Sequence, residues 1–458
     1  NNAVAIDDIY SYGEVIRLSG GAKGLSGDLI KADDSTHVLT LSTVKLSKAG
    51  DAYVLSSVDD FAKLAITWQT FGYFSMIDGV SGGSVSSLAS STINVTGEIN
   101  LAGTGLTGLS KDRGDSGNNE GKADDGGTER ESAHYFSGTL TGTGIINLAV
   151  GEAYGMRGDK VLGLDDVSDG NGKIYRHSRL GLFSAVAAGA KTDDGVTIGG
   201  TMRFENGADI DAGSLAAQVT GTGTVTVANA TFSTAITFDS AATDKILNVG
   251  GVFGSVADAA TLTLGTGAKV QATISTDSNA ADIRVGQVAG YVAGDKAATI
   301  GIIGLEVGGR ITTGNHNGAK TLVGGLIGFI QQGSAKKNVT ITGLAYNDFS
   351  MTVGTSGDSR NGAGGLLGYS WGNAIVTIGG EANKSDSSYA ITTSKTSVVA
   401  KSATEFGGLL YAMSGHLVIQ NHALDLTGAS LSADSATSLG VLLARGGTSD
   451  KNNAFGAE

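Results

Sequence analysis

The sequence predicts an all-β chain wound into a parallel β-helix, or β-solenoid, preceded by one amphipathic helix. A short glycine motif returns along the chain at intervals of roughly 30–45 residues, which is the period of stacked repeat architectures. Short alternating runs of Thr, Val, Ile and Ser separate the copies, as expected of strands and turns. The copies begin at Gly181, Gly213, Gly251, Gly286, Gly325, Gly365, Gly408 and Gly440.

The composition supports strands and excludes several classes of function. The chain has 458 residues, of which 73 are Gly, and it contains no Pro and no Cys. Proline removes a ladder donor and is kept out of interior strands, so its absence suits strands that pair on both sides. Without cysteine there are no disulfides, no zinc–thiolate sites and no cysteine nucleophile.

The charge and hydropathy patterns argue against two kinds of partner. A net charge of −13 repels nucleic acid and anionic membranes. The longest apolar runs, such as 322–330, are far shorter than a membrane span. We therefore expect no nucleic-acid partner and no membrane insertion. The chain starts without Met or a signal peptide, which suggests a mature or excised stretch of a longer protein.

The N-terminal part reads as a strand region followed by the helix. Residues 1–56 hold short alternating runs at 14–18, 37–41, 44–46 and 53–55. Within 57–75, Ser57 is a plausible N-cap with Asp60 three residues on. An apolar stripe follows at helical spacing, made of Phe61, Leu64, Ala65 and Trp68. We interpret this helix as packing on the solenoid or capping its exposed end; a partner-binding helix is the alternative.

Residues 76–179 read as the first solenoid turns, carrying long polar insertions. Alternating strands at 92–101 and 136–148 are separated by a polar stretch at 110–133, and a second insertion covers about 155–178. These insertions contain almost nothing to bury and are expected to be exposed loops.

Residues 180–445 form the repeat region, and 446–458 read as a tail or linker. Each unit opens with the glycine motif and a buried apolar strand such as 326–330. A turn, an alternating strand such as 339–341, and a variable polar excursion follow. Stacking of equivalent strands about 4.8 Å apart would superpose Leu, Ile and Val in the lumen. The pattern leaves open whether one unit makes one coil or more.

The motif resembles the GLUG repeats of bacterial surface proteins, named for a Gly-Leu-x-Gly core. Gly-Leu-Ile-Gly at 325–328 and Gly-Leu-Leu-Gly at 365–368 match that core, and Gly-Val-Phe-Gly at 251–254 is a conservative variant. The copies at 181, 408 and 440 depart at the last position. The helix at 57–70, Ile-Asn-Leu at 99–101 and Phe-Ser-Gly-Thr-Leu-Thr-Gly at 136–142 are similar to the usual lead-in of such proteins, so the resemblance covers roughly 53–445.

The resemblance implies a right-handed parallel β-helix in a large exported bacterial protein. Such proteins are mostly adhesins and stalks, and sometimes non-catalytic parts of secreted proteases. No catalytic residue can be transferred from the family, and the His-Glu-x-x-His signature of metalloproteases is absent.

Few residues in the chain form a pattern typical of catalysis or metal binding. Asp193-Asp194 and Asp124-Asp125 are adjacent carboxylate pairs, but neighbouring strand residues point to opposite faces, so adjacency does not bring the carboxylates together. The segment 165–174 resembles a calcium loop, yet either register places Val167 at a ligand position. An Asp-Gly-Asn turn without metal is the simpler interpretation, and calcium in a different geometry is the alternative. The histidines, none with zincin spacing, are His37, His134, His177, His316, His416 and His422. We predict no catalytic residue, no metal ligand and no cofactor.

Two residue patterns are candidates for binding, although no binding residue can be assigned from them. The pairs Thr224/Thr226, Thr261/Thr263 and Thr340/Thr342 would form outward ladders, most simply as solvent-facing β-formers. Unequal repeat lengths argue against a flat threonine lattice suited to ice or glycans. Aromatic residues that would serve a glycan-binding module are Tyr369, Trp371 and Tyr411, for which core or edge packing is the simpler interpretation.

The sequence therefore predicts an exported β-solenoid at the bacterial cell surface that serves as a structural stalk or adhesin. Its expected partners are surface proteins or glycans of a host or neighbouring cell, with self-association into fibres through exposed strand edges as a second structural option. The alternative from another class is a β-helix polysaccharide hydrolase or lyase, or a glycan-binding module.

Overall fold

The computed structural model describes most of the repeat region and parts of the N-terminal region. The described residues are 3–5, 30–33, 38–41, 45–69, 77, 86–104, 106, 108–109, 135–150, 177–204, 209–238, 246–257, 261–276, 282–292, 298–314, 320–331, 337–354, 362–379, 391–401, 405–407, 410–420, 424–434, 438–440, 443–446 and 455–457. The strand expected at 14–18 and the polar stretch at 110–133 lie outside these ranges.

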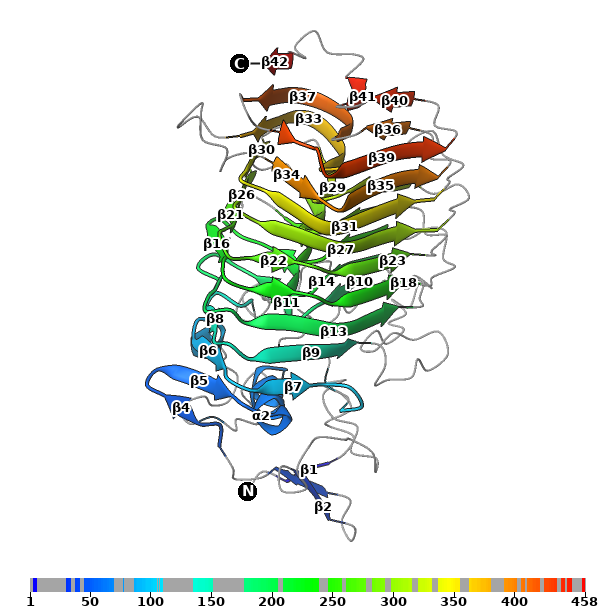
Figure 1. The fold of residues 1–458 in the computed structure, drawn as a ribbon. Helices are drawn as coiled ribbons and strands as arrows, with labels where there is room; N and C mark the ends of the chain where they lie inside the picture. The colour runs from blue at the N-terminus through cyan, green and yellow to red at the C-terminus, as the bar shows by residue number, and fades with distance from the viewer. Residues whose placement is uncertain are drawn as a thin grey trace, which may run out of the picture.

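The chain is a parallel β-solenoid, as the sequence predicted, with three long sheets that run along its axis (Figure 1). The first sheet has eight strands, all paired in parallel. They are β10 (His177–Leu180), β14 (Asp209–Gly213), β19 (Ile246–Gly250), β24 (Asp282–Gly286), β28 (Lys320–Gly324), β32 (Gly362–Gly364), β36 (Glu405–Gly407) and β40 (Ser438–Gly440).

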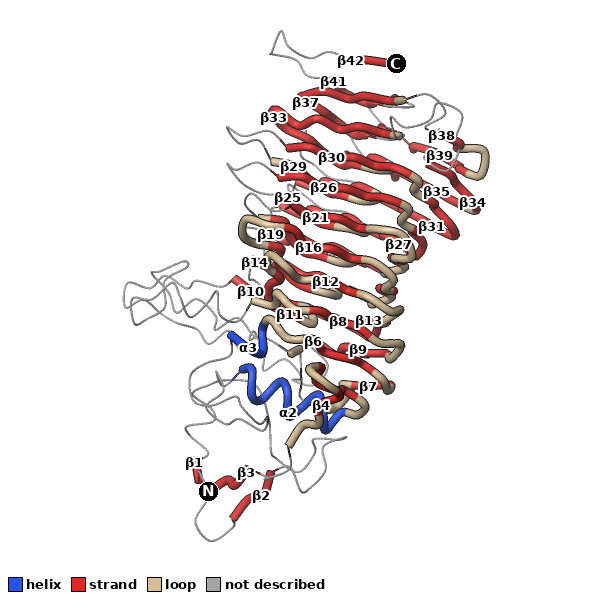
Figure 2. Tube along the Cα trace, turned by 90° about the vertical axis from the view of Figure 1, so that its left-hand side faces the viewer, coloured by secondary structure: helices blue, strands red, loops and turns tan. Residues whose placement is uncertain are grey.

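The second sheet contains two rows of strands that merge near the C-terminal end. Row one is β11 (Phe183–Val186), β15 (Ala216–Val219), β20 (Phe253–Val256), β25 (Ala289–Val292), β29 (Ile327–Ile330), β33 (Leu367–Ile378), β37 (Leu410–Ile419) and β41 (Leu443–Gly446). Row two, which faces the viewer in Figure 2, comprises β4 (Lys48–Ala49), β5 (Ala52–Leu55), β6 (Thr92–Val95), β8 (Thr139–Thr141), β12 (Lys191–Thr192), β16 (Thr224–Val227), β21 (Thr261–Leu264), β26 (Ala298–Ile303), β30 (Lys337–Thr342), the second halves of β33 and β37, and β42 (Phe455–Ala457).

The third sheet closes each coil, and a small antiparallel sheet stands near the N-terminus. The third sheet holds β7 (Glu98–Asn100), β9 (Ile145–Val150), β13 (Thr197–Phe204), β17 (Thr231–Phe232), β18 (Ala235–Phe238), β22 (Lys269–Val270), β23 (Thr273–Thr276), β27 (Glu306–Thr313), β31 (Ala345–Val353), β34 (Ile391–Ser394), β35 (Thr396–Lys401), β38 (Leu424–Asp425) and β39 (Ala429–Asp434). The antiparallel sheet pairs β1 (Ala3–Ala5) and β2 (Ile30–Asp33) with β3 (Val38–Leu41).

One sequence repeat makes one coil, which settles the question that the sequence left open. The chain passes from β24 through β25 and β26 to β27, and β28 then pairs in parallel with β24 one level up. The strand pairing also shows that some repeats start one residue earlier than the glycine motif in the sequence suggested. Gly250, not Gly251, lies level with Gly213 and Gly286, and further on Gly324, Gly364, Gly407 and Gly440 are level with one another.

Aliphatic columns fill the lumen between the sheets. Leu262, Ile300, Val339 and Val376 occupy equivalent positions on successive coils of row two, and all are at most 1% exposed. Their sequence neighbours are exposed or half-buried, which produces the alternation seen in the sequence. Burial of each such side chain contributes about 1.5–3 kcal/mol, and each one packs on the equivalent residues of neighbouring coils.

The last glycine of the motif allows the first sheet and row one to approach closely. A Cβ added at Gly328 would lie 2.5 Å from the backbone nitrogen of Val285, on the first-sheet strand of the preceding coil. A Cβ added at Gly254 would likewise clash with the backbone of Ala212, and one added at Gly290 with the backbone of Val249. Gly at this position therefore avoids a clash with backbone in these three coils, whereas Ala217 and Ser184 stand at the equivalent level in the two preceding coils.

The N-terminal end of the stack carries helix α2 (Val58–Gln69), the amphipathic helix predicted from the sequence (Figure 1). The backbone N–H of Asp60 donates to the N-cap Ser57 Oγ at 3.2 Å, and the Asp60 carboxylate accepts from the Ser56 N–H at 3.0 Å, one residue earlier than in a standard capping box. A second helix of four residues, α3 (Ser86–Ala89), was not predicted.

The buried surface of α2 is wider than the predicted stripe. Every residue from Phe61 to Trp68 is buried, because neighbouring segments cover the helix on several sides. The Trp68 ring lies 6.1 Å from Phe136 and 5.6 Å from Phe183, centre to centre, and these two rings stack at 4.2 Å. The helix thus continues the aromatic core of the first coils, which agrees with packing on the solenoid.

The close approach at the motif glycine yields a stability prediction. Gly328→Ala should lower the free energy of unfolding by about 2–3 kcal/mol, because the new Cβ must displace backbone. Gly301→Ala is the matched control: its Cβ would meet nothing nearer than 3.7 Å, and the change should be neutral or stabilising by about 0.5–1 kcal/mol. Urea unfolding of both variants measures the difference; equal effects would show that the steric explanation is wrong.

Candidate binding surfaces

The Asp193-Asp194 pair lies at the corner between row two and the third sheet, where it stabilises a turn. Asp194 has a φ of +61°. Its Oδ2 accepts from Thr141 Oγ1 at 2.7 Å on the coil below, whereas Asp193 Oδ1 accepts from Asn229 Nδ2 at 3.2 Å on the coil above. The two carboxylates therefore act on different coils and do not converge on one point.

The surroundings of Asp193 favour its charged form. The Asn229 amide and the backbone N–H of Asp194 both donate to this carboxylate, and together with Lys191 they lower the pKa of Asp193 below its ordinary value. A carboxyl group with a lowered pKa is a poorer general acid near neutral pH. The geometry thus supports the interpretation as a turn.

Several predicted positions fall outside the described residues. They are Asp124-Asp125, the segment 165–174, His37, His134, His316 and His422, and the side chains of His177 and Tyr411. His416 lies exposed on β37. In the described ranges, no three His, Cys, Asp or Glu residues are grouped as a metal site would require. The same ranges contain no helix with the length and apolarity needed to cross a membrane.

The threonine pairs form outward columns on row two. Thr224 and Thr226 are level with Thr261 and Thr263, and the second column continues through Gly301 to Thr340. Differences in repeat length fall between the strands, so the register is kept. Thr342, by contrast, is buried and donates to the Gly379 carbonyl at 3.4 Å. Gly301 interrupts one hydroxyl column and Asn338 interrupts the other, so there is no continuous threonine array. The threonines are therefore interpreted as ordinary β-forming residues that face solvent.

Row one carries a column of aromatic residues that the sequence identified only in part. Tyr291, Phe329 and Tyr369 are level on β25, β29 and β33. Their ring centres are 5.7 Å and 5.5 Å apart, and the rings stack. Trp371 follows on the same strand as Tyr369 and is 50% exposed. We name these four residues the aromatic strip. Tyr291 and Phe329 were missed, although each directly follows the last glycine of its motif copy, as Tyr369 does.

A polar network from the first sheet borders the aromatic strip. The Arg284 guanidinium lies 4.2 Å from the Tyr291 ring centre and 5.1 Å from that of Phe329. It donates to Asn248 Oδ1 at 3.3 Å and pairs with Asp282 at 3.3 Å. One coil lower, the buried Asp211 accepts from Asn248 at 2.6 Å and from Ser255 Oγ at 2.7 Å. These contacts bring side chains of two sheets together on the outside of the solenoid.

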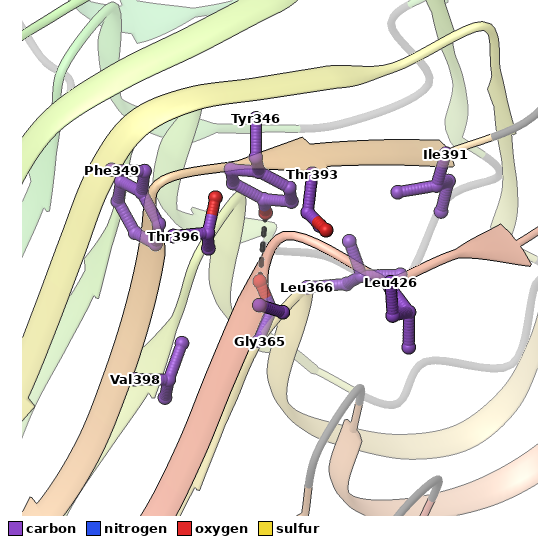
Figure 3. A pocket seen from close by; sticks show the side chains of 10 residues that line it. Tyr346, Phe349, Gly365, Leu366, Ile391, Thr393, Thr396, Val398 and Leu426 are labelled. Atoms are coloured by element: carbon purple, nitrogen blue, oxygen red, sulfur yellow. Dashed lines mark hydrogen bonds between the residues drawn. The ribbon is translucent and has the colours of Figure 1, made fainter.

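A cavity of about 30 Å³ lies inside the solenoid beside Tyr346 (Figure 3). Apolar side chains such as Phe349, Leu366 and Val398 line it, and the Tyr346 hydroxyl donates to the Gly365 carbonyl at 2.7 Å. Such a volume holds little more than a water molecule. The cavity is a packing gap between coils and is too small for a substrate.

No family model, curated protein or solved structure matches this chain.

The buried phenol of Tyr346 generates a pH-dependent prediction. Burial raises the pKa of Tyr346 well above 10.0, so above that pH the unfolded chain ionises this group while the folded chain does not, and stability is lost as pH rises. At about pH 8, Tyr346→Phe should cost about 1 kcal/mol through the lost hydrogen bond. At about pH 11 the difference from wild type should shrink or reverse.

Urea unfolding of both proteins at the two pH values measures this effect. The other tyrosines are common to both chains, so their titration cancels in the comparison. An unchanged difference between wild type and variant would contradict the assignment of the alkaline loss to Tyr346.

Proposed function

We propose that this chain is a structural stalk or adhesin of an exported bacterial surface protein. The observation that carries the proposal is the unbroken parallel pairing from β10 to β40 in the first sheet, which is accompanied by equivalent ladders in the other two. Such a body has a long side surface and one continuous core, and it joins distant points instead of enclosing a pocket.

The architecture suits a protein that bears load. Neighbouring coils are joined by strands of all three sheets, so a pull along the axis acts on many hydrogen bonds at once. Separation of two coils also exposes aliphatic columns such as Leu262–Ile300–Val339, which adds a hydrophobic cost. The corner contacts of Asp193 and Asp194 add side-chain links between coils.

The GLUG-like motif supports the cell-surface and adhesive parts of the proposal. Seven coils share the aligned glycine, and the last glycine of the motif has a clear steric role in the coils that carry it. Host or neighbouring-cell proteins and glycans are the proposed partners. A glycan-binding module remains the second candidate function, because Tyr369 and Trp371 lie on one outward face.

The polysaccharide hydrolase or lyase is less well supported than the stalk. Adjacent carboxylates would have to reach one sugar bond from opposite sides, whereas Asp193 and Asp194 contact different coils and hold a turn. We therefore propose a non-enzymatic role.

Mechanical and adhesive tests address this proposal directly. Pulled from its two ends in an optical trap, the chain should resist load and then lengthen in steps that correspond to single coils. Beads coated with the protein should adhere to cells more than albumin-coated beads. Unfolding at negligible force together with adhesion equal to albumin would contradict the proposal, as would release of reducing ends from a polysaccharide.

A further inference from the structure

The aromatic strip is a continuous feature of the outer surface of row one. Tyr291, Phe329 and Tyr369 come from three successive coils, and their stacked rings run along the solenoid axis. Leu322 of the first sheet packs with these rings, and Phe329 in the middle of the column is only 8% exposed. The lower part of the strip is therefore rigid and held in place from two sheets.

The upper end of the strip is exposed to solvent. Trp371 lies two residues after Tyr369 on β33, so both side chains project from the same face of the strand. Half of the Trp371 surface is exposed, and the described residues include only one other large hydrophobic side chain of comparable exposure, Ile303. An exposed indole close to a half-buried phenol is the kind of group that supplies binding energy at recognition surfaces.

The strip is bordered by an excess of positive charge. Arg284 and Lys320 share one carboxylate, that of Asp282, with nitrogen–oxygen distances of 3.3 Å and 3.2 Å. The Arg284 Nε has no partner and is buried. Lys320 keeps 30% of its side chain exposed. The other carboxylate of the network, Asp211, lies buried one coil lower. In a chain with a net charge of −13, the two cations around Asp282 leave one positive charge beside the strip, which favours an anionic partner.

The size of the strip favours a sugar chain over a protein. A stable protein interface buries about 800 Å² on each partner, whereas only Trp371 and parts of two tyrosines are exposed along this column. The column covers about two strand spacings, or roughly 10 Å, which a short linear oligosaccharide can follow.

We propose that the aromatic strip, with Lys320 and Arg284 beside it, binds a linear polysaccharide that carries carboxylate groups, of the polyuronate type. Sugar rings contact Trp371 and Tyr369, and a carboxylate along the chain faces Lys320. This inference rests on the proposed adhesive function and names the chemistry of its ligand.

Calorimetric titration with oligogalacturonate tests the proposal, with neutral dextran oligosaccharide as the comparison ligand. Wild type should bind the uronate and not dextran. Trp371→Ala should weaken binding at least about tenfold, as expected for removal of an exposed aromatic anchor. Lys320→Gln should weaken it several-fold and flatten its salt dependence, because one screened charge is lost.

The matched control is Ile303→Ala, which removes the other exposed large hydrophobic side chain, 46% exposed, from row two. It should leave the affinity unchanged, and thermal melts should show all three variants folded. Equal affinity for dextran, no binding of uronate, or undiminished binding by Trp371→Ala would overturn the proposal. A Trp371-dependent change of mass in light scattering would instead assign the strip to self-association and overturn it equally.

The outcome is separable from that of the stalk proposal. The pulling experiment uses wild-type protein and no sugar, so a chain that resists load but does not bind uronate would retain the structural function and lose only the ligand assignment.

Discussion

The register of the parallel ladders is the constraint on which the rest of this structure depends. Each coil places its strands level with those of the coil below, so a residue's environment is set by its counterparts in neighbouring repeats. Leu262, Ile300, Val339 and Val376 show the result, since each is buried largely because the others stand above and below it. A polar residue at a lumen position would be buried between the apolar residues of the coils above and below, without a hydrogen-bond partner in either.

The glycine motif combines this register with a close approach between sheets. Because Gly328 has no side chain, row one can lie directly on the first-sheet backbone at Val285. That approach also brings the outward side chains of two sheets within reach of each other. Arg284 comes to lie over Tyr291, and Ser255 bonds to Asp211, through this geometry. A steric requirement of the fold thus creates the polar and aromatic surface proposed for binding.

Two pairs of carboxylates in the described residues show that position in the fold, and not adjacency in the sequence, decides which groups a carboxylate contacts. Asp193 and Asp194 are adjacent in sequence, yet they link a turn to different coils. Asp211 and Asp282 are distant in sequence, yet both belong to one network on the outside of the first sheet. Neither arrangement brings two carboxylates to a common point, and both serve contacts between coils.

The sequence alone determined the fold class, the amphipathic helix and the repeat, because these follow from local patterns: the recurring glycine, the alternation of Leu, Ile and Val, and the spacing from Phe61 to Trp68. It also identified Tyr369 and Trp371. The frame of the repeat, with Gly250 rather than Gly251 in the aligned column, required the observed pairing. The aromatic strip and the cations beside it could also be recognised only in the tertiary structure. Arg284, Phe329 and Tyr369 lie on three different coils and become neighbours only when the coils stack.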